Sequence, residues 1–442
     1  MKKTAFAILL SLLLSFTLSL FTGCMNKDEE SLYYLNFKPE VADVYNELAA
    51  DYKKETGKTL RVVTAASGTY EQTLKSEIGK KDPPVLFQIN GPKGYASWKN
   101  YCLDLSGSAV YEHLTDKDLA IRDGEGVYGI PYVVEGYGII YNKALTDKYF
   151  ALPGRQTTVN SMDEIKSFNA LKTVVEDMTL NKSALGIGGV FASTSLKSGE
   201  DWRFQTHLAN VPVYYEFTEK NVDLTGEGTK TVEFTYNKEY KQLFDLYINN
   251  SCTDKKLLGS KQVADSMAEF ALEQCVMVQN GNWAWGQIKS VAGNKTTEDN
   301  IRFLPLYMGT PNEESMGLCI GTENFFAVNK TVSAEKQQMA LDFLEWLYTS
   351  ETGKDYVLNR LDFIAPFDTF TEDERPNDPL AKEMIRYMND DKLTTIPWYF
   401  TVFPSQSFKN DFGAALLQYA QETKTWDEVV RVFTERWEAE NR

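Results

Sequence analysis

The strongest constraint on the fold is an alternation of apolar strands and amphipathic helices at the start of the chain. "SLYYLNF", residues 31–37, is a continuous apolar run typical of a buried strand. A helix follows, opened by Pro39 and ended by Gly57, with apolar residues at intervals of three and four. "TLRVVTAA" and residues 84–89 repeat the strand pattern, with a short helix over 69–78 between them. Strand–helix–strand units at this spacing predict a parallel sheet with right-handed crossovers.

A second region repeats this alternation beyond residues 126–143. That segment, "GVYGIPYVVEGYGIIYNK", is apolar and broken by Gly and Pro, so we interpret it as a strand pair that leaves one lobe for another. The elements expected after it are a helix opened by a capping box at 161–164, a strand in "LGIGGV", a helix over 239–248, a helix ending in "EFALEQC", strands in "VMVQNG" and "IRFLPLY", a crossing strand in "GLCIGTENFFAVN" and a last helix opened by a capping box at 425–428.

These elements predict an α/β protein of two lobes, each a mainly parallel sheet flanked by helices. Several crossing strands, rather than one flexible tether, are expected to join the lobes. The first lobe is predicted to hold residues 32–136 and 319–364, and the second lobe residues 137–318 and 365–442.

The first residues form an export signal rather than part of the fold. Lys2 and Lys3 precede the apolar run 5–21, and Gly23 and Cys24 follow it. This order predicts a lipoprotein signal over residues 1–23, a lipid-bearing Cys24 and a tether over 24–31. The alternative is an uncleaved membrane anchor, but the run is short for a span of about 20 residues.

Charge and cysteine usage exclude several classes of function. The net charge of −16 argues against nucleic acid and other polyanions, because phosphate binding needs a basic surface. Apart from Cys24, the cysteines are Cys102, Cys252, Cys275 and Cys319, which allow three full disulfide pairings. Isolated thiols are slightly favoured, because a chain of this length does not need covalent staples. The sequence has no CxxC pattern, so neither a metal knuckle nor a cofactor is expected.

The search for catalytic motifs is mostly negative. The sequence has only two histidines, His113 and His207, and it contains no HExxH, GxSxG or P-loop pattern. A literal GxGxxG begins at Gly124 but runs into Pro131, which indicates a turn before a hairpin. Residues 223–228 hint at a calcium loop, yet Phe234 stands where the closing Glu belongs. We therefore expect a protein without enzymatic activity, although a pair of carboxylates acting as a surface glycosidase stays open.

Aromatic and polar side chains gather where strands are expected to end. Trp283 follows an apolar strand inside a Gly/Asn turn, in "NGNWAWGQI". The other aromatic candidates are Tyr70, Tyr137, Trp202, Trp398 and Phe403, and the polar candidates are Lys38, Glu40, Glu71, Gln88, Asn90, Glu135 and Asn282. Ligands of open α/β sheets bind beyond the carboxyl ends of the strands. Aromatic faces combined with hydrogen-bonding groups favour a sugar, whose C–H side stacks on rings while its hydroxyls need donors and acceptors.

These motifs resemble the bacterial extracellular solute-binding proteins of the maltodextrin-binding type, which serve carbohydrate ABC importers. "NGNWAWGQI" is similar to the strand-end motif of that family, and Trp283 takes the place of its sugar-stacking tryptophan. In "IPYVVEGYGIIYNK", Glu135 falls where the family has a sugar-contacting acid, and "NFKPE" resembles its ligand-contacting loop. Gln88 stands where the maltodextrin binder has a Trp, a departure that argues against a long α-glucan. The likeness at Trp202 and over 398–403 is positional only.

The resemblance implies a two-lobed periplasmic-binding fold of type II that closes around its ligand at a hinge. It further implies a monomeric, lipid-anchored extracytoplasmic receptor that hands an oligosaccharide to an ABC permease in the membrane. A polyamine, a peptide or a metal in the same fold is the alternative ligand. The amides of Gln88, Asn90 and Asn282 favour neutral hydroxyls over a cation.

Overall fold

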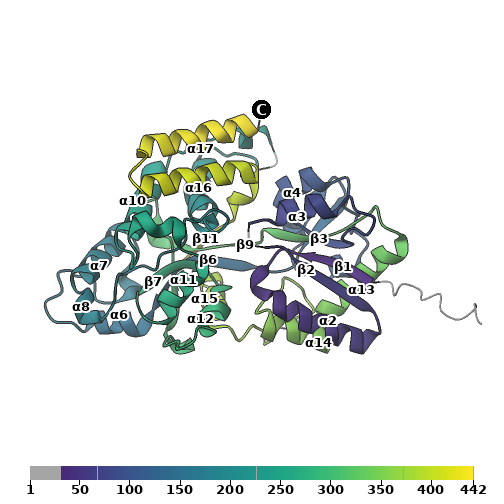
Figure 1. The fold of residues 1–442 in the computed structure, drawn as a ribbon, viewed down its shortest axis with the longest axis horizontal. Helices are drawn as coiled ribbons and strands as arrows, with labels where there is room; N and C mark the ends of the chain where they lie inside the picture. The colour runs from purple at the N-terminus through teal and green to yellow at the C-terminus, as the bar shows by residue number, and fades with distance from the viewer. Residues whose placement is uncertain (1–30, 67, 225, 372, 442) are drawn as a thin grey trace, which may run out of the picture.

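The computed structural model describes residues 31–441 apart from residues 67, 225 and 372. The predicted signal over 1–23 and Cys24 therefore lie outside the described residues. The described chain forms two α/β lobes side by side, each built around its own sheet (Figure 1). Among the described residues, no helix combines the length and apolarity needed to span a bilayer. The two-lobed α/β prediction is confirmed.

The first lobe contains a six-stranded sheet in the order β2-β1-β3-β10-β5-β4. Its strands are β1 (Ser31–Asn36), β2 (Thr59–Thr64), β3 (Leu86–Asn90), β4 (Ile121–Asp123), β5 (Gly126–Pro131) and β10 (Asn324–Val328). β1 pairs in parallel with β2 and β3, whereas β10 is antiparallel to both β3 and β5. Consequently β1, β2, β3 and β5 point the same way, as the mainly parallel prediction requires.

The helices of the first lobe follow from the patterns seen in the sequence. They are α2 (Ala42–Thr56), α3 (Tyr70–Glu77), α4 (Gly91–Trp98), α5 (Ala109–Glu112), α13 (Ala334–Thr349) and α14 (Glu351–Asp355). The apolar face of α2 is buried through Tyr45, Leu48 and Tyr52. Gly57 ends this helix with φ 74°, a left-handed conformation that glycine adopts without strain.

The second lobe contains the sheet β11-β9-β6-β7, with β8 also paired to β6. Its strands are β6 (Glu135–Asn142), β7 (Met277–Gly281), β8 (Ile301–Leu304), β9 (Met316–Gly321) and β11 (Thr394–Ile396). β7, β8 and β9 are all antiparallel to β6, so β6 is the one described strand of this sheet that opposes the others. Its helices are α6 (Lys143–Phe150), α7 (Phe168–Leu180), α8 (Lys182–Leu185), α9 (Ala209–Glu219), α10 (Asn237–Asn249), α11 (Val263–Ala271), α12 (Ala284–Lys289), α15 (Pro379–Met388), α16 (Gln406–Ala420) and α17 (Trp426–Glu440).

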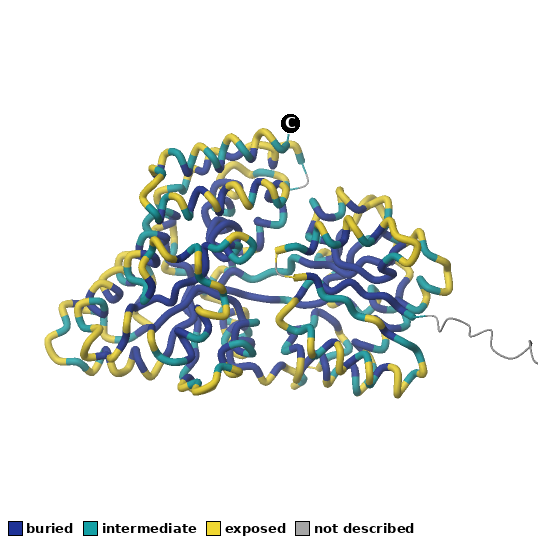
Figure 2. Tube along the Cα trace, in the orientation of Figure 1, coloured by how far each residue is buried: buried dark blue, intermediate teal, exposed yellow. Residues whose placement is uncertain are grey.

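Two crossings join the lobes where the sequence predicts them. β5 belongs to the first sheet and β6 to the second, while β9 and β10 make the return step in the opposite direction. Both crossings run through the waist of the molecule (Figure 1), and the β5–β6 crossing is mostly buried (Figure 2), with Val134 half-buried between the two strands. They bring Glu135, at the start of β6, and Glu323, just before β10, to the junction of the lobes.

The lobe boundaries at 136/137, 318/319 and 364/365 stay a prediction. Phe367 still contacts the first lobe, with its ring centroid 4.2 Å from that of Tyr348. We infer that the last crossing to the second lobe follows Phe367 rather than residue 364.

Two local predictions are wrong. Residues 161–164 do not open a long helix, because Glu164 accepts the N–H of Asn160 and Ser161 makes no capping hydrogen bond. The helix begins later, where Ser167 accepts the N–H of Ala170. "LGIGGV" does not form a strand, since Leu185 ends α8 and residues 186–190 belong to no helix or strand; only the following Phe191 makes isolated bridges. The capping box at 425–428 is confirmed at the start of α17.

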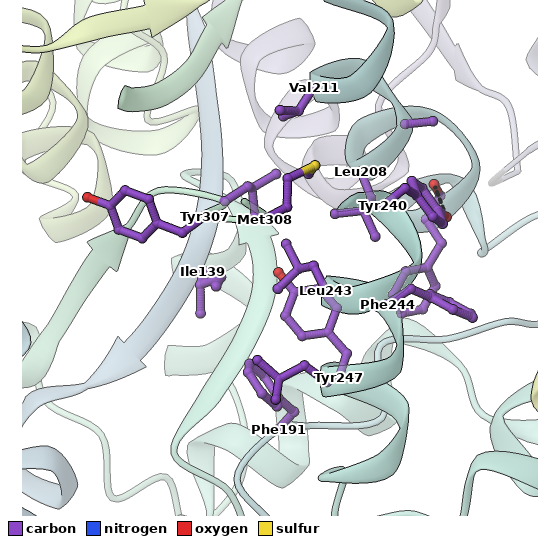
Figure 3. Packing of buried hydrophobic residues seen from close by; sticks show 14 of the residues in the cluster. Ile139, Phe191, Leu208, Val211, Tyr240, Leu243, Phe244, Tyr247, Tyr307 and Met308 are labelled. Atoms are coloured by element: carbon purple, nitrogen blue, oxygen red, sulfur yellow. Dashed lines mark hydrogen bonds between the residues drawn. The ribbon is translucent and has the colours of Figure 1, made fainter. Parts of the chain in front are cut away.

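The core of the second lobe supports the segment that later forms a wall of the site. Leu243, Phe244 and Tyr247 of α10 pack among other buried apolar side chains (Figure 3). The Tyr240 hydroxyl of the same helix donates a hydrogen bond to the Phe204 carbonyl at 3.0 Å. This bond ties the core to residues 202–208. None of the described cysteines, Cys102, Cys252, Cys275 and Cys319, forms a disulfide.

Candidate ligand-binding cleft

A cavity of about 430 Å³ lies between the two lobes, near the carboxyl ends of β1 and β3. Its volume falls within the range of roughly 300–1,000 Å³ that is usual for small-molecule sites. The predicted site residues that line it are Lys38, Glu40, Tyr70, Glu71, Asn90, Glu135, Trp202, Trp283, Trp398 and Phe403. The structure therefore brings together side chains that come from both lobes and are far apart in the sequence.

Aromatic rings of the second lobe form one wall of this cavity. Trp202 and Trp283 are partly exposed, with ring centroids 5.9 Å apart, and Trp398 is 5% exposed. Glycine makes room for two of these rings, since a Cβ at Gly281 would clash with Trp283 and one at Gly321 with Trp398. The Gly/Asn turn of the sequence motif thus lets an indole lie over the end of β7.

A π-helical segment, Arg203–Leu208, supplies more of the same wall. His207 stacks on Phe400 with centroids 4.7 Å apart and lies 4.6 Å from the centroid of Trp202. The Arg203 guanidinium lies 3.9 Å from the centre of the Trp202 ring, and its Nε donates to Asn280 Oδ1 at 3.0 Å. These contacts hold Trp202 with its ring beside the cavity. π-helical turns of this kind occur often at functional sites.

A buried ion-pair group faces the aromatic wall. The Lys38 Nζ lies 2.7 Å from Glu135 Oε1, 3.3 Å from Glu40 Oε1 and 5.5 Å from the ring centre of Trp283. Burial alone lowers the pKa of Lys38, but the two carboxylates outweigh it and raise the pKa above its ordinary value. Burial raises the pKa of Glu135, and Lys38 opposes that rise. Lys38 thereby favours the ionised form of the hinge carboxyl, against the effect of burial.

Three predicted site residues are buried behind the cavity instead of lining it, which corrects the sequence prediction. The Gln88 side-chain Oε1 accepts the N–H of Phe37 at 2.7 Å. The Asn282 side-chain Oδ1 accepts the Gly136 N–H at 3.0 Å, and the Asn282 main-chain N–H donates to the Gly136 carbonyl at 2.9 Å. The Tyr137 hydroxyl donates to the His207 carbonyl at 3.0 Å. Each of these three side chains makes a hydrogen bond to a main-chain atom, so its role is to hold the backbone around the cavity in place.

Several cavity residues were missed from the sequence: Asp201, Gln205, His207, Glu323, Asn324, Phe400, Thr401 and Lys409. Glu323 carries a signal that sequence reasoning could have used. It is a charged residue inside the apolar crossing "GLCIGTENFFAVN", as Glu135 is inside the other crossing. The helical lysine Lys409 carries no such signal, because its sequence context is that of an ordinary amphipathic helix.

The lobes touch each other across the mouth of the cavity. A Cβ at Gly68 of the first lobe would lie 2.8 Å from the Gly199 Cα of the second, and one at Gly91 would lie 2.9 Å from the Thr401 Cβ. The Lys93 ammonium also donates to Asn441 Oδ1 at 2.9 Å. Glycine at the two contact points lets the opposing backbones approach closely, so the lobes are closed over the cavity.

Three buried carboxyl groups predict how the Tm of the empty protein changes with pH. Burial raises the pKa of Asp201 and of Glu323 to about 6, and that of Asp378, at the N-cap of α15, to about 7. These values exceed those of the unfolded chain, so the stabilisation is present at low pH and is lost as the pH rises through about 6 to 7. We expect the Tm to fall between about pH 5.5 and about pH 7.5. Thermal unfolding monitored by circular dichroism tests this, and a Tm that is flat or rises over that range would contradict it.

Asp378→Asn is the matched variant for this pH experiment. An asparagine still accepts the Ala381 N–H at the N-cap, but it does not titrate. The fall in Tm with pH is expected to be smaller in this variant than in the native protein.

A two-lobed α/β protein that is closed over a ligand-sized cavity, with crossing strands at its waist, is a hinged ligand-binding protein. Among the described residues, no group of His, Cys, Asp or Glu side chains is arranged to hold a metal ion.

The family model for bacterial extracellular solute-binding protein matches residues 47–383, and the chain belongs to this family. No curated protein matches the sequence. Similar solved structures are a chitin oligosaccharide binding protein (TM-score 0.70, 16% identity, 94% of this chain and 99% of that one) and RafE in complex with raffinose (0.68, 18%, 93% and 100%). A sugar transporter of Bacillus licheniformis in complex with stachyose is also similar (0.66, 16%, 93% and 100%). These TM-scores show a shared fold.

Proposed function

We propose that the protein is an extracytoplasmic receptor that binds an oligosaccharide in the interlobe cavity and delivers it to an ABC importer. The lobes close on the ligand, and the closed form is the one that the permease recognises. The ligand-contacting residues in this proposal are the predicted side chains that line the cavity, joined by those that sequence reasoning missed. Gln88, Tyr137 and Asn282 hold the walls in place.

The observation that carries the proposal is a cavity lining that combines aromatic rings with donor and acceptor side chains, four of which have a buried polar atom without a partner. The indole N–H groups of Trp283 and Trp398 have no acceptor, and the side-chain oxygens of Gln205 and Asn324 have no donor among the described residues. All four residues line the cavity. Buried polar groups are nearly always hydrogen bonded, and leaving one unpaired costs about 1–3 kcal/mol. A ligand that offers both donors and acceptors satisfies this mixture.

Sugar hydroxyls have that property, because each one donates and accepts. The apolar C–H face of a sugar ring covers an indole or phenyl ring at the same time. The ligands named for the similar proteins, a chitin oligosaccharide, raffinose and stachyose, support this class of ligand. A polyamine fits less well, because it carries only donors and positive charge. It would leave the two indole N–H groups without acceptors.

A glycosidase is disfavoured by the state of the hinge carboxylate. The Glu135 Oε1 lies 2.7 Å from the Lys38 Nζ, so this oxygen is already occupied by a partner within the protein instead of being free to reach a glycosidic oxygen. The members of the matched family are solute-binding proteins.

A thermal-shift screen of the protein without residues 1–23 tests the function. We expect raffinose, stachyose, maltotriose, xylotriose or chitotriose to raise the Tm, because a ligand at 100 times its Kd stabilises a protein by about 2.7 kcal/mol. Spermidine and a tripeptide are the controls. A shift with a control alone, or release of shorter sugars in a chromatographic assay, would contradict the proposal.

The proposed membrane attachment depends on Cys24. Expressed in a bacterium that processes lipoproteins, the native protein is expected to incorporate labelled palmitate and to sediment with membranes. Cys24→Ser should abolish labelling and release the protein from the membrane, because the variant protein carries no acyl chain. Cys102→Ser is the matched control, since Cys102 is buried in the first lobe. Membrane attachment that survives Cys24→Ser would refute the lipid anchor.

A further inference from the structure

Lys409 is a cavity-lining lysine without a partner. It lies on α16 of the second lobe, and its ammonium makes no hydrogen bond or ion pair with any described residue. Burial lowers its pKa, while the carboxylates of Glu323 and Glu71 oppose that effect from a distance. Lys38, in the same cavity, has two carboxylates within 3.3 Å. The Lys409 ammonium can therefore donate hydrogen bonds to a ligand, whereas the Lys38 ammonium already donates to two carboxylates.

The two carboxylates that face Lys409 also have free capacity. Glu323, at the hinge, accepts a hydrogen bond from Asn90 Nδ2 at 3.2 Å and makes a second one with the Asn324 side chain. Glu71, on α3 of the first lobe, receives one bond from Trp98 Nε1 at 3.0 Å. An ionised carboxylate has about four acceptor positions. A donor-only group of one lobe thus faces acceptor-only groups of the hinge and the other lobe across the cavity.

Only some ligand groups match this arrangement. A carboxylate or sulfate would pair with Lys409 but be repelled by Glu323 and Glu71, whereas an amine would be attracted by the two carboxylates but could not accept a hydrogen bond from Lys409. A hydroxyl oxygen accepts from the ammonium while its hydrogen is donated to a carboxylate. Two adjacent hydroxyls on a sugar ring can bridge a longer distance between the ammonium and a carboxylate than one hydroxyl can, with one hydroxyl accepting from the ammonium and the other donating to the carboxylate.

We propose that Lys409, together with Glu323 and Glu71, is a specificity-determining group that binds adjacent hydroxyls of an uncharged sugar ring and disfavours uronic acids. The inference rests on the proposed function of the same cavity. It also predicts an unusual pair of effects for one substitution. The half-buried Lys409 ammonium makes no ion pair in the empty protein, so its removal should not lower stability even though it weakens binding.

Calorimetric titration of four proteins tests the inference: the native protein, Lys409→Met, Glu323→Gln and the double variant. The probe is whichever of raffinose, maltotriose and chitotriose binds the native protein most tightly. Each single substitution should weaken binding about tenfold or more, as expected for lost hydrogen bonds to charged groups. The double variant should lose less than the product of the two single losses, because both groups hold the same hydroxyls. The Tm of empty Lys409→Met should equal or exceed that of the native protein.

Lys382→Met is the matched control, because Lys382 is exposed on α15 and does not line the cavity. Its affinity for the probe should match that of the native protein. A Lys409→Met variant that binds the probe with native affinity and has a lowered Tm would show a purely structural lysine and overturn the inference alone. A native protein that binds none of the three probes overturns the proposed function and this inference together.

Discussion

Trp283→Ala is expected to weaken saccharide binding by roughly 30- to 1,000-fold, the effect of removing an interface hot spot worth about 2–4 kcal/mol. The reason is that Trp283 contributes a partly exposed aromatic ring to the lining of the cavity. The ring is partly exposed, so the empty protein should lose little stability. Calorimetric titration with the saccharide found in the thermal-shift screen, and thermal unfolding of the empty protein, measure the two effects.

Trp285→Ala is the matched control from the same motif. Trp285 lies two residues further along, is 4% exposed and packs in the second-lobe core away from the cavity. Its removal should cost about 3–5 kcal/mol of stability, as for other buried tryptophans. The two variants are therefore expected to separate binding from stability. A Trp283→Ala protein that binds normally but unfolds much earlier would show that Trp283 is a core residue.

Lys38→Met should lower the free energy of unfolding by about 3–5 kcal/mol, because it leaves Glu135 buried without its counter-charge. Burial already raises the pKa of Glu135, and loss of Lys38 raises it further. A carboxyl with a raised pKa contributes stability at low pH that is lost as the pH rises. The defect is thus expected to be larger at about pH 8 than at about pH 5, as measured by urea unfolding at both values.

Glu135→Gln added to Lys38→Met is the control for this charge effect. Glutamine keeps the size of the side chain but carries no charge, so the double variant should recover most of the lost stability and lose the added pH dependence. A single Lys38→Met variant as stable as the native protein at both pH values would show that the ion pair does not support the hinge.

The large-scale fold could be predicted from the sequence because the decisive signals are local. The helix that ends at Gly57 and the crossing around Glu135 follow from apolar periodicity and from the positions of Gly and Pro. The two capping boxes show where local signals stop being sufficient. Thr425 caps its helix, whereas Glu164 binds the backbone of Asn160 and leaves Ser161 without its partner.

The site could be predicted only where chemistry and strand ends coincide in the sequence. Trp283 was found because an indole in a Gly/Asn turn after a strand is unusual. Asn90 ends β3 and reaches the cavity, but Gln88 lies two residues earlier, where the backbone of Phe37 covers it. Lys409 reaches the cavity only because α16 packs against the π-helical segment, a contact between distant parts of the chain.

The most direct test of a saccharide receptor is calorimetric titration of the protein without residues 1–23 against raffinose, stachyose, maltotriose, xylotriose and chitotriose. We predict saturable binding of one molecule per protein for at least one of them, with a Kd near or below micromolar, about −8 kcal/mol, and a negative heat-capacity change. The absence of binding to every saccharide, alongside saturable binding of spermidine or a peptide, would contradict the account.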